Sequence, residues 1–179
     1  MRVRRGKVII DEAVFSKIAD GDNEALTDLY ELTYKPVFAL LLSCTQNYHD
    51  AEDLLQETYI KICQGARLYK SGGNPMAWIM TIAKNLYISK YRKDSKIITD
   101  YFQEEVEQIP YEFISETEDR LLIEKLIRTL KEEERNIIIL HVMQGFTFRE
   151  ISEILDKPSG TVLSLYHRGI KKLRKALGD

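Results

Sequence analysis

Apolar residues recur at intervals of three and four through both ends of this 179-residue chain, and no alternation of apolar and polar residues persists anywhere. The first pattern is typical of amphipathic helices, and alternation is typical of strands. Residues 94–118 interrupt the helical pattern, because they are acidic and contain Ile109-Pro110. The sequence therefore predicts an all-α protein with two small helical domains, 1–94 and 119–179, joined by an acidic linker at 95–118.

Charge is spread unevenly along the chain, although the formal net charge is only −2. Five basic residues and one acidic residue lie between positions 75 and 96, and six basic residues and one acidic residue lie between 157 and 179. Residues 99–119 hold eight acidic residues and neither lysine nor arginine. The two basic segments predict two surfaces that face nucleic-acid phosphates, which the average charge hides.

Four helices are predicted in the N-terminal half. The first covers 12–18, and the second begins with Asp22 or Asn23 as its cap and continues to Cys44. The third covers 51–64 with Asp50 as its cap, and the fourth begins at Asn74-Pro75, after a loop at 66–74. The side chains of the fourth helix that we expect to face inward are Trp78, Ile79, Ile82, Ala83, Leu86 and Ile88.

The strongest single pattern covers residues 146–177. Thr147 is placed to cap a helix, with Glu150 at the reciprocal position, and Gly160 is expected to allow a tight reversal before the last helix at 161–177. Val162, Leu165, Gly169 and Leu173 have the spacing of a buried face, and the other face is basic. This is the pattern of a helix-turn-helix whose second helix suits the DNA major groove. The alternative is an ordinary basic C-terminal helix.

Membrane and secretory segments are not expected. No apolar stretch approaches the ~20 residues of a membrane span, and the basic start lacks the apolar region of a secretory signal. Cys44 and Cys63 lie in apolar surroundings without a CxxC spacing, so we expect two reduced core thiols and a cytoplasmic protein.

Motifs in both halves resemble one family. Residues 126–140, 145–151 and 160–164 are similar to region four of RNA polymerase sigma factors, and residues 50–58 and 78–85 resemble region two. The two motifs occur in this order with no domain between them. The chain therefore resembles the extracytoplasmic-function group of the sigma-70 superfamily, whose members are DNA-binding specificity subunits of RNA polymerase and not enzymes.

The resemblance implies two roles for the N-terminal domain. Region two of the family binds the clamp of core RNA polymerase through an acidic helix, and the matching positions are Asp50, Asp53, Gln56 and Glu57. From the residues alone, these form a solvated acidic face. Region two also opens the −10 element and holds an unstacked base between a loop and the next helix. The matching positions are Tyr69 and Asn85, with Lys84, Lys90, Arg92 and Lys93 placed to follow phosphates.

For the C-terminal domain, the resemblance implies recognition of the −35 element and docking on the polymerase flap. The positions that match the family's DNA contacts are Leu163, Ser164, His167, Arg168, Lys171 and Lys172. The sequence departs from the family at Leu163 and Leu165, where arginine is common. Apolar contact is therefore expected to replace readout of a base edge at the first of these sites.

Partners are implied by the same resemblance. They are core RNA polymerase and promoter DNA, together with an anti-sigma factor of the kind that often holds relatives inactive. No cofactor, metal or membrane insertion is expected. The acidic linker is expected to prefer a basic channel, since the family's linker enters the polymerase.

Three other functions are compatible with parts of the sequence. His49-Asp50 is a pair found in metal phosphohydrolases, but such a site needs further ligands, and the other histidines are His141 and His167. A ligand-sensing regulator would bind duplex DNA without polymerase. A sigma-like protein that has lost initiation activity has the same motifs.

Overall fold

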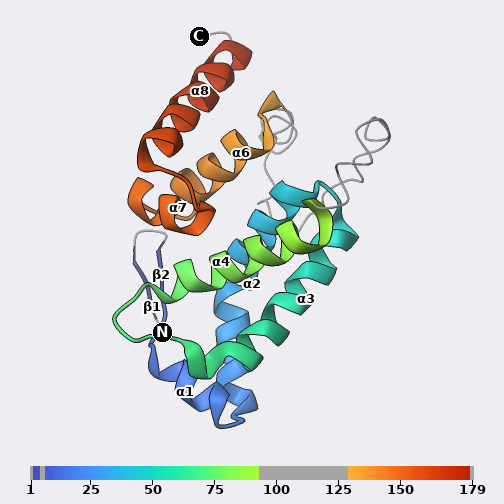
Figure 1. The fold of residues 1–179 in the computed structure, drawn as a ribbon, viewed down its shortest axis with the longest axis vertical. Helices are drawn as coiled ribbons and strands as arrows, with labels where there is room; N and C mark the ends of the chain where they lie inside the picture. Colours follow the sequence, from blue (N-terminus) through green and yellow to red (C-terminus); the bar gives the residue numbers. More distant parts are fainter. Residues whose placement is uncertain (1, 5–6, 93–128, 178–179) are drawn as a thin grey trace. The chain divides into compact units, whose positions relative to one another are not determined.

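The computed structural model describes residues 2–4, 7–92 and 129–177, with side chains for 9–90 and 129–176. The chain divides into two compact units, Met1–Glu107 and Gln108–Asp179, and each is described separately below. Apart from one short hairpin, the elements of the described residues are helical (Figure 1), which confirms the all-α fold. The predicted linker at 95–118 lies outside the described residues, so the predicted domain boundaries remain predictions.

The hairpin at the N-terminus was not predicted. Strands β1 (Arg2–Arg4) and β2 (Lys7–Ile9) pair antiparallel, with Val3 opposite Val8. Each strand has three residues, whereas alternation becomes a usable signal only over about four to eight residues. The hairpin is therefore too short for the sequence pattern to indicate.

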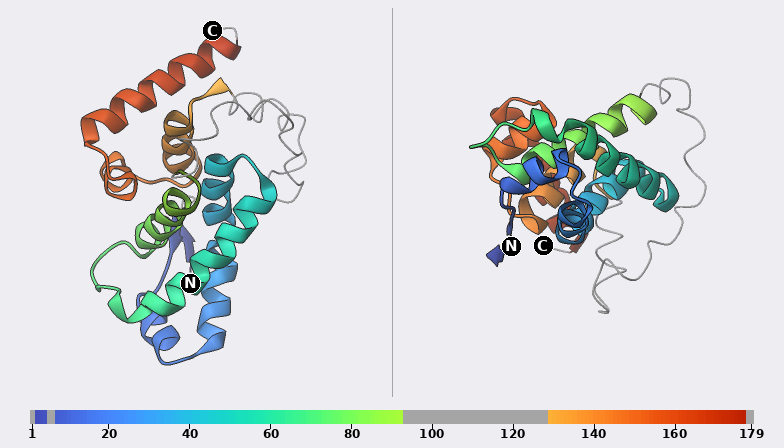
Figure 2. Two further views of the ribbon diagram at one scale, coloured as in Figure 1. Left: turned by 45° about the vertical axis from the view of Figure 1, so that its right-hand side comes forward. Right: turned by 90° about the horizontal axis from the view of Figure 1, so that it is seen from below.

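Packed helices make up the rest of the first unit. Its elements are α1 (Ala13–Ala19), α2 (Asn23–Thr45), α3 (Tyr48–Gly65), the 3-10 turn η1 (Ala66–Leu68), α4 (Pro75–Tyr87) and the π-helical turn η2 (Ile88–Arg92). Helices α2, α3 and α4 pack on one another, while α1 contacts α2 and η1 (Figures 1 and 2). The centre of this packing is fully buried and aliphatic, and includes Leu29, Leu40, Leu54, Ile62 and Ile79.

Side-chain caps fix where these helices begin. Asp22 accepts hydrogen bonds from the amides of Glu24 and Ala25, both at 3.0 Å, and Asn74 accepts one from Ala77 at 3.2 Å, as predicted. The prediction that Asp50 caps α3 is wrong. Asn47 has an extended backbone and accepts from the Asp50 amide at 3.0 Å, so the helix begins at Tyr48.

The buried face of α4 agrees with the predicted one only in part, since Ile79 and Ala83 are buried as expected. The buried residues are Met76, Ile79, Met80, Ala83 and Lys84, whereas Trp78, Ile82 and Leu86 are only half-buried. Most positions of this helix are apolar, so periodicity alone does not decide which stripe faces the core. Packing on α2 and α3 makes that choice.

The two cysteines also differ. Both are free thiols, and Cys44 is buried, as expected for a core residue. Cys63 is exposed, so the expectation that both thiols lie in the core is wrong for this residue. Cys63 follows the fully buried Ile62 along α3, and this position turns its side chain away from the core.

None of the helices in the described part of the chain is both long and apolar enough to cross a membrane.

In the second unit, three helices form a small core. Its elements are α6 (Glu132–Ile138), the π-helical turn η5 (Ile139–Met143), α7 (Phe148–Leu155) and α8 (Ser159–Leu177). Helix α8 packs on both α6 and α7, and Ile137, Leu140, Ile151, Ile154 and Val162 are fully buried.

The predicted cap of α7 is confirmed. The Thr147 hydroxyl accepts from the Glu150 amide at 3.3 Å, and the Glu150 carboxylate accepts from the Thr147 amide at 2.8 Å. The start of the helix is therefore fixed by two reciprocal hydrogen bonds.

The reversal between α7 and α8 does not depend on Gly160. That residue lies inside α8, and the left-handed backbone falls instead on Asp156, with φ 51° and ψ 53°. Lys157 holds the turn in place, since its amide donates to the Ser152 carbonyl at 3.0 Å and its ammonium lies 2.8 Å from Glu133 Oε1. The prediction placed the turn at Gly160 because glycine is the usual residue in a left-handed backbone conformation.

Candidate nucleic-acid interface

Helix α8 has one buried and one exposed face. Val162, Leu165 and Gly169 are buried against the rest of the unit. Five of the six residues predicted to contact DNA are exposed together on the remaining surface of the helix, and these are Leu163, Ser164, His167, Arg168 and Lys171. An exposed helix face that carries cationic and hydrogen-bonding groups can enter a major groove and contact both phosphates and base edges.

Lys172 is the exception among the six. Its ammonium lies 2.6 Å from Oε2 of Glu134, whose side chain is fully buried, and the Lys172 side chain is two-thirds buried. The charge is therefore neutralised within the unit and is directed toward α6 rather than toward solvent. We correct its assignment from a DNA contact to a contact that fixes α8 on α6.

The two leucines that depart from the family pattern lie in different environments. Leu163 is 41% exposed, so its apolar surface is available to a DNA groove. Leu165 is 7% exposed and belongs to the core. The departure at Leu165 therefore concerns packing, and only Leu163 bears on base recognition.

His141 supports the fold of this unit. Its Nδ1 lies 2.8 Å from the carbonyl oxygen of Phe146, and its ring stacks on Phe148 at 4.2 Å. The Tyr166 ring lies 5.0 Å from the rings of both His141 and Phe148. It is edge-on to His141 and inclined at 61° to Phe148, and its contact with Phe148 joins α8 to α7. Among the described residues, no three His, Cys, Asp or Glu side chains gather as a metal site would require.

The residues predicted for the −10 element are spread over the first unit. Asn85 and Lys90 are exposed, and Tyr69 is half-buried in the loop before α4. Lys84 is 9% exposed and lies on the buried face of α4, so its predicted role in following phosphates is corrected. The side chain of Arg92, and all of Lys93, lie outside the described residues.

The predicted polymerase-binding residues follow one side of α3. Asp53 and Gln56 are exposed, and Asp50 and Glu57 are half-buried. Glu57 Oε2 lies 3.6 Å from the ammonium of Lys90, and both groups are partly solvated. Such a surface pair contributes about 0–1 kcal/mol, so the acidic face is not locked by it.

A group of tyrosines where α2 meets α3 was not predicted. Tyr30 is 40% exposed, and its ring stacks on Tyr34 at 5.3 Å and meets Tyr59 at 4.8 Å. Burial, together with the nearby charges of Tyr34, Glu52 and Tyr48, raises the pKa of Tyr30. Tyr30 and Tyr34 lie on α2 and Tyr59 lies on α3, so the pattern along one helix could not reveal that Tyr30 meets Tyr59.

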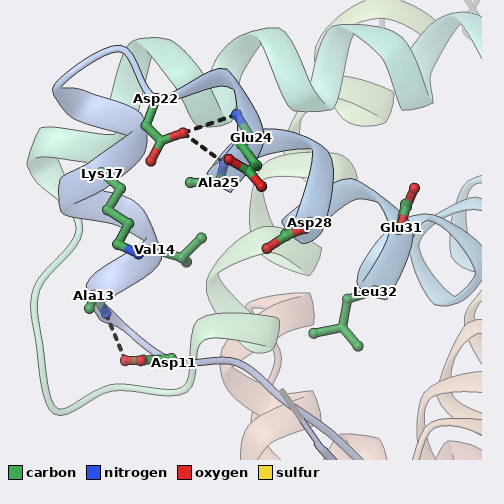
Figure 3. A pocket seen from close by; sticks show the side chains of 10 residues that line it. All are labelled: Asp11, Ala13, Val14, Lys17, Asp22, Glu24, Ala25, Asp28, Glu31 and Leu32. Carbon is green, nitrogen blue, oxygen red and sulfur yellow. Dashed lines mark hydrogen bonds between the residues drawn. The ribbon is translucent and has the colours of Figure 1, made fainter.

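A hollow of about 730 Å³ lies between α1 and α2, and five of its ten lining residues are carboxylates (Figure 3). Two of these carboxylates have structural roles. Asp11 accepts from the Ala13 amide at 3.0 Å, and Asp22 caps α2. The hollow contains none of the residues predicted to contact DNA, and its acidic lining is unsuited to phosphates.

Comparison with known families matches both units. Residues 29–97 match the family described as "Sigma-70 region 2", and residues 120–173 match the family described as "Sigma-70, region 4". These are the segments, in the same order, that carry the predicted −10 and −35 surfaces.

Similar whole proteins include two curated sigma factors. The chain is 28% identical to the ECF RNA polymerase sigma factor SigW of Bacillus subtilis, over 91% of this chain and 94% of SigW. It is 30% identical to the ECF RNA polymerase sigma factor SigE of Mycolicibacterium smegmatis, over 92% of this chain and 66% of SigE.

Two solved structures are also similar. One is the sigma factor RpoE of Bartonella quintana in complex with the anti-sigma factor NepR, with a TM-score of 0.72 and 27% identity over 85% of this chain and 96% of RpoE. The other is CnrH in complex with the cytosolic domain of CnrY, with a TM-score of 0.69 and 19% identity over 94% of this chain and 97% of CnrH, a similarity of fold.

Proposed function

The chain belongs to the extracytoplasmic-function group of the sigma-70 family, and from this we propose how its two units share the recognition of a promoter. As a member of this group, it binds core RNA polymerase and directs promoter-specific initiation through −10 and −35 elements. It is a regulatory subunit. We propose further that it has no catalytic activity of its own and acts in the cytoplasm, beside the polymerase.

We assign the −35 element to α8. The observation that carries this assignment is the single exposed face that holds Ser164, His167, Arg168 and Lys171 opposite a buried apolar face. Arg168 is the candidate for bidentate contact with guanine, and Leu163 for apolar contact with a thymine methyl group. Lys171 carries a charge suited to a phosphate.

The −10 element is assigned to the first unit. Asn85 offers an amide that can read a base edge, and Tyr69 offers an aromatic ring in the loop before α4. We keep Lys90, Arg92 and Lys93 as the residues that follow phosphates, and we leave out Lys84 because it is buried.

The clamp of core polymerase is assigned to the acidic side of α3. Asp50, Asp53, Gln56 and Glu57 lie along one side of this helix and are exposed or half-buried. Charge complementarity there would speed the encounter with a basic surface.

Run-off transcription with core polymerase on a genomic promoter library tests the proposed function. The expected result is a set of defined transcripts that require both the chain and core polymerase. A ligand-sensing regulator would instead bind its duplex site without polymerase. A chain that binds core polymerase but starts no transcripts would be a sigma-like protein without initiation activity.

Replacing Arg168 by Ala should weaken binding of the holoenzyme to −35 duplex DNA by about 1–3 kcal/mol, because a bidentate contact with a base would be lost. Equilibrium titration of a labelled duplex measures this. Arg168→Lys is the matched variant, since it keeps the charge but lacks the planar fork. Recovery of affinity in Arg168→Lys would indicate a phosphate contact, and an unchanged promoter profile in Arg168→Ala would remove Arg168 from the interface.

We also propose an anti-sigma factor as a partner, because the similar RpoE structure is a complex with one. A protein that co-purifies with the chain and represses its run-off transcription would support this. A chain that is isolated from cells only with core polymerase would count against it.

A further inference from the structure

The loop between η1 and α4 is attached to a helix far away in the sequence. The hydroxyl of Tyr69 donates to Oε1 of Glu12 at 3.1 Å, across 57 positions. The amide of Gly72 donates to Oε2 of the same carboxylate at 2.9 Å, across 60 positions. One carboxylate therefore holds a side chain and a backbone amide of the loop together.

The side chain of Glu12 does not cap its own helix. Glu12 occupies the cap position of α1 with helical backbone angles, and its side chain makes no cap hydrogen bond. Asp11 accepts from the Ala13 amide instead, at 3.0 Å. Both oxygens of Glu12 are thus directed to the loop, which no pattern within residues 11–19 could indicate.

The opposite end of α1 holds η1, which leads into the same loop. Nη2 of Arg67 donates to the carbonyl oxygen of Ala19 at 3.3 Å. Between the two ends, the ring of Phe15 packs on Tyr69 at 4.2 Å, and Trp78 of α4 lies edge-on to Phe15 at 5.1 Å. Phe15 is 1% exposed, so this aromatic contact is part of the core.

Tyr69 is kept as a hydrogen-bond donor by its surroundings. Burial, together with the hydrogen bond from Tyr69 to Glu12 and the charge of Glu12, raises the pKa of Tyr69 to about 12. The phenol therefore keeps its proton well above neutral pH and remains the donor in the hydrogen bond to Oε1 of Glu12. Gly72 supplies the left-handed backbone, with φ 88°, that turns its amide to the second oxygen.

We infer that α1 holds residues 67–72 in place and that Glu12 is a positioning residue. Glu12 fixes the conformation in which this segment meets an unstacked base of the −10 element. The inference rests on the proposed function of the loop. A hollow of about 300 Å³ lies between α1 and this segment, with Arg67, Tyr69 and Ser71 in its lining. When Glu12 is removed, the loop populates the binding form less often, and apparent affinity falls by the same fraction.

The test uses holoenzyme and fork-junction DNA whose non-template −10 strand is already single-stranded. Glu12→Gln should lower affinity for this DNA about 10-fold and reduce discrimination among the four bases at each −10 position. Tyr69→Phe keeps the ring and loses one of the two hydrogen bonds, so its loss should be smaller. Because both variants act on one contact, the double variant should lose less than the two single losses combined.

Matched controls separate positioning from damage to the fold. Glu24→Gln changes an exposed carboxylate at the start of α2 and should leave every reading unchanged. Affinity for core polymerase and for −35 duplex DNA should be as in the unchanged protein for all of these variants.

Three negative outcomes are distinguishable. If the unchanged holoenzyme shows no preference among −10 bases in fork DNA, the proposed function of the loop is wrong. If the unchanged holoenzyme discriminates, and Glu12→Gln discriminates equally well, only the inference about Glu12 is overturned. A parallel loss of core affinity in Glu12→Gln would also overturn it, since Glu12 would then support the whole unit rather than the loop.

Discussion

Replacing Glu134 by Ala is expected to destabilise the second unit by about 2–4 kcal/mol. The Glu134 side chain is fully buried, and Oε2 accepts from the Lys172 ammonium at 2.6 Å and from the Lys131 amide at 3.1 Å. Without the carboxylate, a largely buried ammonium and a helix-start amide lose their acceptor. The estimate lies below that for a fully buried pair because Lys172 is one-third exposed.

Tryptophan fluorescence would not report on this unit, because the only tryptophan, Trp78, lies in the other one. Hydrogen exchange of the α8 amides therefore measures the effect. The control is Glu153→Ala. That carboxylate pairs with Arg149 at 3.5 Å, but the two side chains are 66% and 89% exposed, so the expected change is below about 0.5 kcal/mol. Equal protection of α8 in both variants would contradict the role given to Glu134.

The same pair predicts a pH dependence. Burial alone would raise the pKa of Glu134, but the hydrogen bonds from Lys172 and Lys131 and the charges of Lys172 and Arg168 outweigh it, and the pKa is lowered. A lowered pKa stabilises the fold above the carboxyl's unfolded-state pKa, and this stabilisation is lost as pH falls through the folded-state value. Protection of α8 should therefore decline in acid, and this decline should be smaller in Glu134→Gln.

Replacing Gly169 by Val is expected to destabilise the second unit by about 2–3 kcal/mol. A Cβ at this position would lie 2.7 Å from Cδ1 of Ile138 and 3.4 Å from Cβ of Glu134. The two further methyl groups of valine would push α8 away from α6, and the DNA-facing residues would move with the helix. The loss of stability is measured by thermal unfolding, with hydrogen exchange of α8 as the readout. The displacement of the DNA-facing residues is measured by titration of −35 duplex DNA.

Two smaller substitutions frame this prediction. Gly169→Ala should be close to neutral, because the helix gains up to about 1 kcal/mol from alanine, while the crowded atom is the terminal methyl of a flexible side chain. A Cβ at Gly160 would meet nothing within 4 Å, so Gly160→Ala should be stabilising. If Gly169→Val were as stable as Gly160→Ala, close packing of α6 on α8 would not be the reason for glycine at 169.

Local signals predicted the starts of several helices. Asp22, Asn74 and the Thr147–Glu150 pair each cap the helix that follows them, because a capping side chain bonds to amides two or three residues away and needs no distant partner. Asn47 was missed for Asp50, since both residue types cap well and only the backbone conformation decides between them. The helical class of the fold follows from the same local information, together with the spacing of apolar residues.

Contacts between helices could not be predicted in this way. Lys84 was expected in solvent and is buried, and Lys172 was expected on DNA and is paired with Glu134. Each residue lies at the edge of the apolar stripe of its helix, where a small rotation moves a side chain from surface to interior. The contacts of Glu12 are harder still to predict, because its partners in the loop follow it by 57 and 60 positions in the sequence.

The pairing of Lys172 has a consequence for counter-ions. A lysine that neutralises a DNA phosphate releases cations condensed on the duplex, and each such contact steepens the fall of log affinity with log salt by about 0.9. Lys172 already has the carboxylate of Glu134 at 2.6 Å, so it adds nothing to this release. The promoter complex should therefore tolerate rising ionic strength better than the number of lysines on α8 implies.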